Sequence, residues 1–177
     1  MVPRPVDRDG ITIARPSKQP SPKIIYVTPS HQFPLGMTMS LARRTALIDF
    51  ARARDAYIFE DDHNSEFRYT GPPLPCLQGL DNSGRVIYAG TMSKILYPSS
   101  RLGYILAPEQ LVEPMIKIRA VMDQHSPAID QATLARFRCA GTPDAPIRFP
   151  AGVPRECCPH SLPRGALSAR CIAGAGA

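Results

Sequence analysis

The sequence lacks any apolar run long enough to cross a bilayer, and it lacks a charged-then-apolar signal segment at its start. These absences argue against a membrane-spanning or secreted protein, so we predict a cytoplasmic protein with no membrane partner. The 177 residues are enough for one domain with a sizeable core.

Basic runs are also absent, although the formal net charge is +6. Residues 138–177 carry five arginines against two acidic residues. The other charges are dispersed, without the basic clusters and interleaved aromatic residues of a nucleic-acid-binding face. Four of the five cysteines lie in the same segment, their spacing matches no metal-binding pattern, and an odd number argues against a disulfide framework. We therefore predict a solvated surface without a nucleic-acid or metal site.

The sequence does contain short apolar runs that alternate with helical patterns. The runs predict buried strands at residues 24–27, 56–59, 86–89 and 102–107. Helical patterns lie at residues 38–54, 108–122 and 128–137. Because a strand, a helix and a parallel strand form a right-handed crossover unit, we predict an α/β fold with a mainly parallel sheet and flanking helices.

Apolar spacing also predicts which way two of these helices face. In the helix at 38–54 we expect three arginines to lie largely on the outer face, namely Arg43, Arg44 and Arg52. In the helix at 108–122 we expect four apolar residues to face the core, namely Leu111, Met115, Ile118 and Met122.

Composition divides the chain into three parts. Residues 1–23, rich in proline and charge, predict an exposed lead-in, and residues 24–137 hold the predicted α/β domain. Residues 138–177 contain six prolines, no lysine and no regular period, which predicts a tail of low order. So abrupt a change is typical of translation in a shifted reading frame or of a wrongly placed gene end, and we keep both as hypotheses.

One lysine lies in an unusual place. Lys94 closely follows residues 85–89, a predicted buried strand. A strongly hydrated ammonium group is costly there unless it has a partner or is neutralised by reaction, and lysine forms Schiff bases with carbonyl cofactors. Thr91, Ser93 and Arg101 lie close enough in sequence to bind an anion beside it. A lysine next to a phosphate site indicates pyridoxal 5'-phosphate.

Four stretches in this order carry a resemblance to a known family: residues 27–36, 60–69, 74–81 and 90–104. They resemble the class I/II aminotransferases of fold type I, which depend on pyridoxal phosphate. They are most similar to the aminotransferase-like domain of GntR/MocR-type bacterial transcriptional regulators. The resemblance covers residues 1–137 and implies part of the large domain of that fold.

The resemblance implies roles for six residues. Lys94 would form the internal aldimine with the cofactor and, in an enzyme, would transfer protons. Asp61 would pair with the pyridine nitrogen and keep the ring protonated. His63 stands where the regulators have a tyrosine that contacts the ring's phenolic oxygen, and an imidazole titrates near neutral pH. The phosphate would be bound by the other three, Thr91, Ser93 and Arg101.

Other residues near these motifs have no cofactor role in our prediction. We expect Glu60 and Asp62 to be solvated loop acids. Phe33 occupies the place of the asparagine in the Asn-Pro-Thr-Gly turn of amino-acid aminotransferases, so a direct asparagine contact to the cofactor is absent. Nearby His31 is equally well explained as a ligand contact or as a hydrogen-bonded structural residue.

The resemblance also implies parts that we do not find in this sequence. In the regulators a DNA-reading helix-turn-helix and a glycine-rich phosphate turn precede the matching segment, and a C-terminal domain follows it. We therefore expect no DNA binding by this fragment. The family implies a homodimer and an amino-acid-like small-molecule effector or substrate.

Three functions stay open. The first is a pyridoxal-phosphate-binding domain fragment of a GntR/MocR-type regulator, which Phe33 and the acidic cluster at 60–63 favour. The second is an aminotransferase acting on amino acids and keto acids. The third is a non-functional truncated remnant whose sheet has lost strands.

Overall fold

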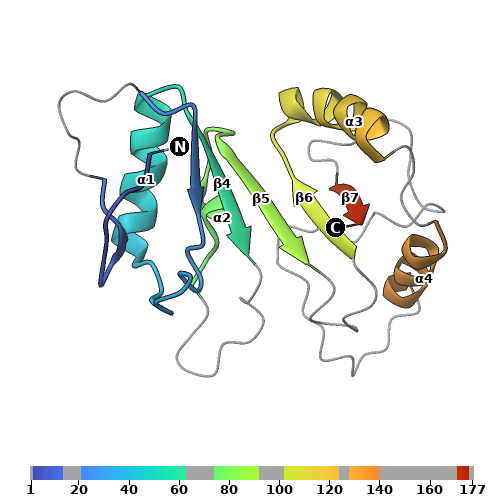
Figure 1. The fold of residues 1–177 in the computed structure, drawn as a ribbon, viewed down its shortest axis with the longest axis horizontal. Helices are drawn as coiled ribbons and strands as arrows, with labels where there is room; N and C mark the ends of the chain where they lie inside the picture. The colour runs from blue at the N-terminus through green and yellow to red at the C-terminus, as the bar shows by residue number, and fades with distance from the viewer. Residues whose placement is uncertain are drawn as a thin grey trace. The chain divides into compact units, whose positions relative to one another are not determined.

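A computed structural model describes residues 2–13, 21–62, 74–91, 102–123, 128–139 and 171–175. The chain forms two compact units, Met1–Ala89 and Gly90–Ala177, which we describe separately. The strands of the main sheet follow the order β3-β4-β5-β6-β7 (Figure 1). The sheet is mixed, because β3 pairs with β4 in parallel and β6 pairs with β7 antiparallel.

The first unit contains a strand, a helix and a parallel strand in succession. They are β3 (Ile24–Val27), α1 (Leu41–Ala53) and β4 (Tyr57–Asp62). The short helix α2 (Leu77–Leu80) and the strand β5 (Val86–Thr91) follow, and β5 continues into the second unit. The Ser40 hydroxyl accepts a hydrogen bond from the Arg43 N–H at 3.4 Å and so caps α1. The predicted crossover unit is thus present.

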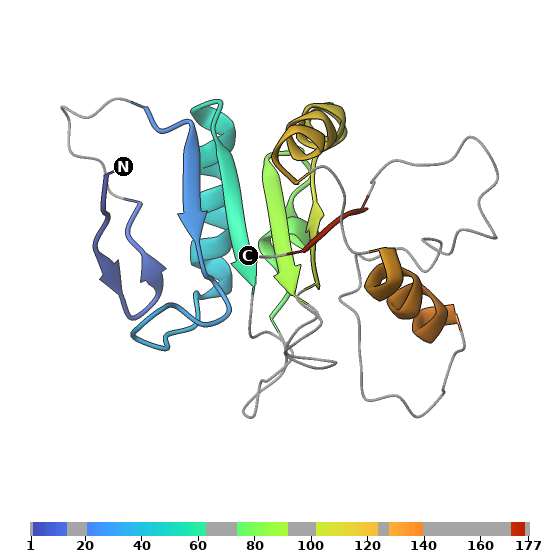
Figure 2. The same cartoon turned by 45° about the vertical axis from the view of Figure 1, so that its right-hand side comes forward.

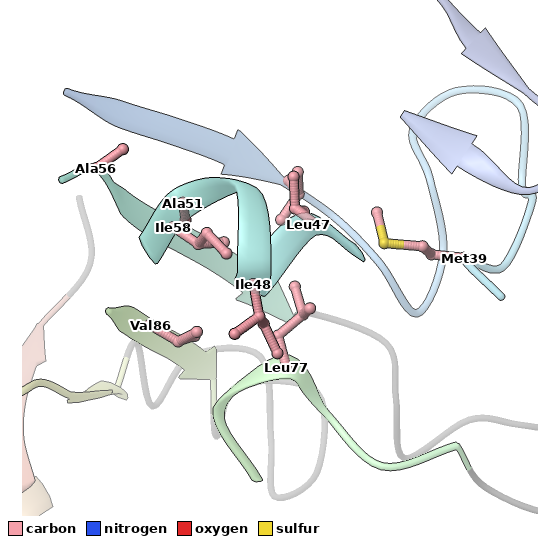
Figure 3. Close-up of a cluster of buried hydrophobic side chains, with 9 residues drawn as sticks. Met39, Leu47, Ile48, Ala51, Ala56, Ile58, Leu77 and Val86 are labelled. Carbon is pink, nitrogen blue, oxygen red and sulfur yellow. The ribbon is translucent and has the colours of Figure 1, made fainter. Parts of the chain in front are cut away.

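The hydrophobic core of this unit lies between α1, α2 and one face of the strands (Figures 1 and 2). Figure 3 shows side chains of α1 pointing toward those of β4, β5 and α2. The buried cluster consists of Val27, Met39, Leu47, Ile48, Ala51, Ala56, Ile58, Leu77 and Val86.

A small hairpin within residues 2–13 contacts the start of α1. Its strands, β1 (Val6–Asp7) and β2 (Gly10–Ile11), pair antiparallel. Arg43 of α1 donates one hydrogen bond to the Asp7 carboxylate at 2.9 Å and another to the Ile11 carbonyl oxygen at 2.7 Å. This part of the predicted lead-in is therefore paired with the domain that follows it.

The predicted outer-face position of Arg44 is wrong. Its side chain is 1% exposed, whereas Arg52 lies at the surface as expected. Arg44 precedes Leu47, Ile48 and Ala51 by three, four and seven residues, which is the helical spacing of a single face. It therefore lies at the end of the apolar stripe and points into the unit.

The second unit contains the end of β5 and four further elements. They are β6 (Leu102–Leu106), α3 (Glu109–Asp123), α4 (Ala128–Cys139) and β7 (Cys171–Ala175). Among the described residues of the whole chain, no helix is long and apolar enough to cross a membrane.

The predicted core face of α3 is wrong in its second half. Ile118 is 59% exposed and Met122 is 76% exposed, while Val112 is buried. The less exposed residues of α3 include Val112, Met115 and Arg119, which recur every three to four residues. Successive residues of a helix are rotated by about 100° around its axis. The packed face therefore follows the less exposed residues, and Ile118 and Met122 lie outside it.

Candidate functional site

The three acidic residues at 60–62 lie in a strand and not in a loop. β4 continues to Asp62, so its side chains alternate between the two faces of the sheet. Glu60 and Asp62 are 0% and 3% exposed, and the expectation that they are solvated loop acids is therefore wrong. Asp61 has the opposite orientation to both and stays partly exposed at the carboxyl end of β4. Ligands of open α/β sheets bind at such strand ends.

A tyrosine from the neighbouring strand holds Asp61. The Tyr26 hydroxyl donates a hydrogen bond of 2.5 Å to Oδ2 of Asp61. The Tyr26 ring stacks on Phe59, with 6.0 Å between ring centroids and 16° between ring planes. Sequence reasoning assigned Tyr26 no role, although parallel pairing of the two predicted strands would have placed it near the acidic cluster.

The buried carboxylates have partners inside the first unit. Glu60 accepts hydrogen bonds of 2.9 Å from the backbone N–H groups of Leu77 and Gln78, in the first turn of α2. Asp62 accepts a hydrogen bond of 3.0 Å from the buried Tyr88 hydroxyl. β4 is thereby tied to α2 and β5 by the two residues that flank Asp61.

Burial raises the pKa of Glu60 from its ordinary 4.5 to about 7. The nearby Asp62 charge adds to the increase, whereas the two backbone hydrogen bonds and the charge of Arg44 oppose it. The Glu60 carboxyl group therefore gains and loses its proton close to neutral pH.

We expect the free energy of unfolding to depend on pH through Glu60. Below pH 4.5 the Glu60 carboxyl group is protonated in both the folded and the unfolded chain, and its stabilising contribution to the free energy of unfolding is complete. Between pH 4.5 and 7 the unfolded chain loses the proton while the folded one keeps it, so the contribution falls with rising pH, by up to about 3 kcal/mol. Urea unfolding at a series of pH values should show that, in Glu60→Gln, the free energy of unfolding no longer falls in this way between pH 4.5 and 7. The exposed Asp49→Asn is the control, and parallel wild-type and Glu60→Gln profiles would contradict the prediction.

Arg44 joins the loop after β3 to the segment before α2. It donates to three carbonyl oxygens, those of Met39 at 3.1 Å, Pro75 at 3.0 Å and Pro29 at 3.0 Å. The Met39 N–H also donates to the Pro29 carbonyl oxygen at 2.8 Å, which closes the neck of the loop. Phe33, near the tip of this loop, is 81% exposed, and His31 is exposed as well.

In the second unit, the predicted phosphate ligand Thr91 is the last residue of β5. Its hydroxyl donates a hydrogen bond of 3.4 Å to the Leu102 carbonyl oxygen. The preceding Gly90 is packed against the Tyr104 ring.

The structure therefore describes two of the six predicted site residues. Asp61 belongs to the first unit and Thr91 to the second, and each has been placed within its own unit. The other four lie outside the described residues, namely His63, Ser93, Lys94 and Arg101.

Comparison with known proteins gives one matching family. The model of the family "Aminotransferase class I and II" matches residues 7–137, which is more than half of the chain.

Among individual proteins, two regulators are similar over most of this chain. The uncharacterized HTH-type transcriptional regulator YdeL of Bacillus subtilis (strain 168) is 47% identical over 137 residues, 77% of this chain and 29% of that protein. The probable rhizopine catabolism regulatory protein MocR of Rhizobium meliloti is 44% identical over 141 residues, 80% of this chain and 28% of that protein. The chain thus spans less than a third of the length of either regulator.

A solved structure is similar in fold. It is that of LysN, the alpha-aminoadipate aminotransferase from Thermus thermophilus, complexed with N-(5'-phosphopyridoxyl)-L-leucine. The TM-score is 0.70 at 25% sequence identity, and the match covers 81% of this chain and 38% of that one. The α/β fold class and the fold type I resemblance are confirmed.

Proposed function

Because the chain belongs to the class I and II aminotransferase family, we propose that it is a pyridoxal-phosphate-binding segment of a GntR/MocR-type transcriptional regulator. The observation that carries the proposal is the partly exposed residue Asp61 near the carboxyl end of β4, whose carboxylate is held by a tyrosine of the neighbouring strand. The 47% and 44% identity to two regulators favours the regulator branch of the family.

We expect two residues of the first unit to bind the pyridine ring of this cofactor. A carboxylate beside the ring nitrogen favours the protonated ring, and the bound cofactor then acts as an electron sink. Asp61 would supply that carboxylate, and His63 would donate to the phenolic oxygen. The hydrogen bond from Tyr26 restricts the rotation of Asp61, as a preorganised ligand site requires.

The residues around the end of β5 would bind the rest of the cofactor. Lys94 would hold it covalently through its ε-amine. Arg101 would form paired hydrogen bonds to the phosphate, with the Thr91 and Ser93 hydroxyl groups donating at close range. In the intact regulator we propose a homodimer that responds to an amino-acid-like small molecule and contacts DNA through other segments.

A second candidate is an aminotransferase acting on amino acids and keto acids. The structural likeness to LysN, an enzyme, favours it. Turnover of an amino acid by the cofactor-loaded chain would identify this candidate, whereas binding without turnover would agree with a regulator.

We expect pyridoxal phosphate added to the purified chain to produce a violet absorbance band that requires Lys94. Lys94→Ala should abolish the band, because the ε-amine is the group that reacts with the cofactor aldehyde. Lys117→Ala is the matched control, since Lys117 is 73% exposed and pairs with Glu113 on α3. Absorbance spectra in the near-ultraviolet and violet, recorded as the cofactor is added, give the result.

Two outcomes would contradict the proposal. Equal spectra for the wild type and Lys94→Ala would show that no part of the absorbance comes from Lys94. A chain that binds exposed-surface dyes and melts without a cooperative transition would support a non-functional remnant.

A further inference from the structure

Tyr26 is placed to act on the proposed cofactor site, although it lies just before the first of the four stretches that carry the family resemblance. β3 and β4 pair in parallel with Tyr26 opposite Phe59, so Asp61 lies two residues beyond the partner of Tyr26. Because side chains alternate between the two faces of a sheet, Tyr26, Phe59 and Asp61 share one face. The hydroxyl of Tyr26 donates to Oδ2 of Asp61 at 2.5 Å.

Two contacts restrict the tyrosine itself. Its ring stacks on Phe59, and its hydroxyl donates a hydrogen bond to the Asp61 carboxylate. Partial burial, then the hydrogen bond and the charge of Asp61, raise the pKa of Tyr26 to about 12. The phenol therefore keeps its proton near neutral pH and stays a donor.

We propose that Tyr26 is a positioning residue for bound pyridoxal phosphate, because its hydroxyl holds one oxygen of Asp61 and so presents the carboxylate to the ring nitrogen in one orientation. This inference rests on the proposed function. It assigns no proton transfer to Tyr26, which acts through Asp61 alone.

Tyr26→Phe separates this role from a structural one. Phenylalanine keeps the ring and its stacking on Phe59, and Tyr26 is 57% exposed, so the urea midpoint should stay at the wild-type value. Affinity for pyridoxal phosphate should fall about tenfold, as expected for losing one hydrogen bond to a charged group. The induced circular dichroism of the bound cofactor should weaken, because the ring would be held in more than one orientation.

Tyr57→Phe is the matched control. Tyr57 also lies on β4, four residues before Asp61, and its ring lies against the Arg85 guanidinium, with 5.3 Å from the guanidinium carbon to the ring centroid. The same loss of a hydroxyl there should leave cofactor affinity and induced circular dichroism unchanged.

The outcomes distinguish the inference from the function on which it rests. If the wild-type chain binds pyridoxal phosphate and Tyr26→Phe matches it in affinity and induced circular dichroism, the inference is overturned and the proposed function stands. If affinity falls but the urea midpoint falls with it, Tyr26 is structural and the inference is again overturned. If the wild-type chain does not bind the cofactor, both are overturned.

Discussion

Arg44→Met should lower the free energy of unfolding by about 3 to 5 kcal/mol. Methionine fills much of the arginine's volume but donates no hydrogen bond. Three carbonyl oxygens would each lose a donor, those of Pro29, Met39 and Pro75. Buried Glu60 would also lose the positive charge that favours its ionised form. Urea unfolding followed by far-ultraviolet circular dichroism measures the effect.

Two variants test whether the effect belongs to the buried guanidinium group. Arg44→Lys should lower the free energy of unfolding less than Arg44→Met does. Its stability should still be well below that of the wild type, because one ammonium group cannot reproduce the spread of donors across a guanidinium. Arg52→Met removes an exposed arginine of the same helix, whose ion pair with Asp49 is worth about 0.5 kcal/mol or less. A loss in Arg44→Met no larger than in Arg52→Met would show that the three carbonyl contacts add nothing to stability.

Much of the fold was predictable because its signals are local. Four apolar runs give the strands of the sheet between residues 24 and 107, and a helical pattern gives the first long helix, which Ser40 caps. The position of Asp61 near the carboxyl end of β4 was predictable for another reason, because the apolar run just before it marks that strand.

The errors at Arg44 and Glu60 have one physical cause, which is that a polar residue was assigned to the surface by its type. Arg44 donates to the Pro75 carbonyl oxygen, 31 residues away, and Glu60 accepts from the Leu77 N–H, 17 residues away. Only the folded chain brings these backbone groups near, and they allow the two side chains to be buried. No local pattern reports such partners. Tyr26 was missed similarly, since its bond to Asp61 joins residues 35 apart and depends on strand register.

The glycine before Thr91 shows another constraint that local patterns do not report. Gly90 is buried in β5, and a Cβ atom there would lie 2.5 Å from Cζ and 2.6 Å from Oη of Tyr104. The Tyr104 side chain is 4% exposed and so has little room to move. Close packing of this kind explains why a residue without a side chain precedes the predicted phosphate ligand.

Gly90→Ala should therefore lower the free energy of unfolding by about 3 kcal/mol, at the upper end of the usual cost of overpacking, because a rigid ring must be displaced. Chemical denaturation of the variant gives the value. Gly79→Ala is the control: Gly79 is an exposed helical residue whose added Cβ would meet only Cys76 Sγ at 3.4 Å, so this change should be neutral or slightly stabilising.

Tyr104→Leu shortens the side chain that the new methyl group meets. Gly90→Ala combined with Tyr104→Leu should thus be little less stable than Tyr104→Leu alone, whereas strictly additive losses would show that the ring is not the obstacle.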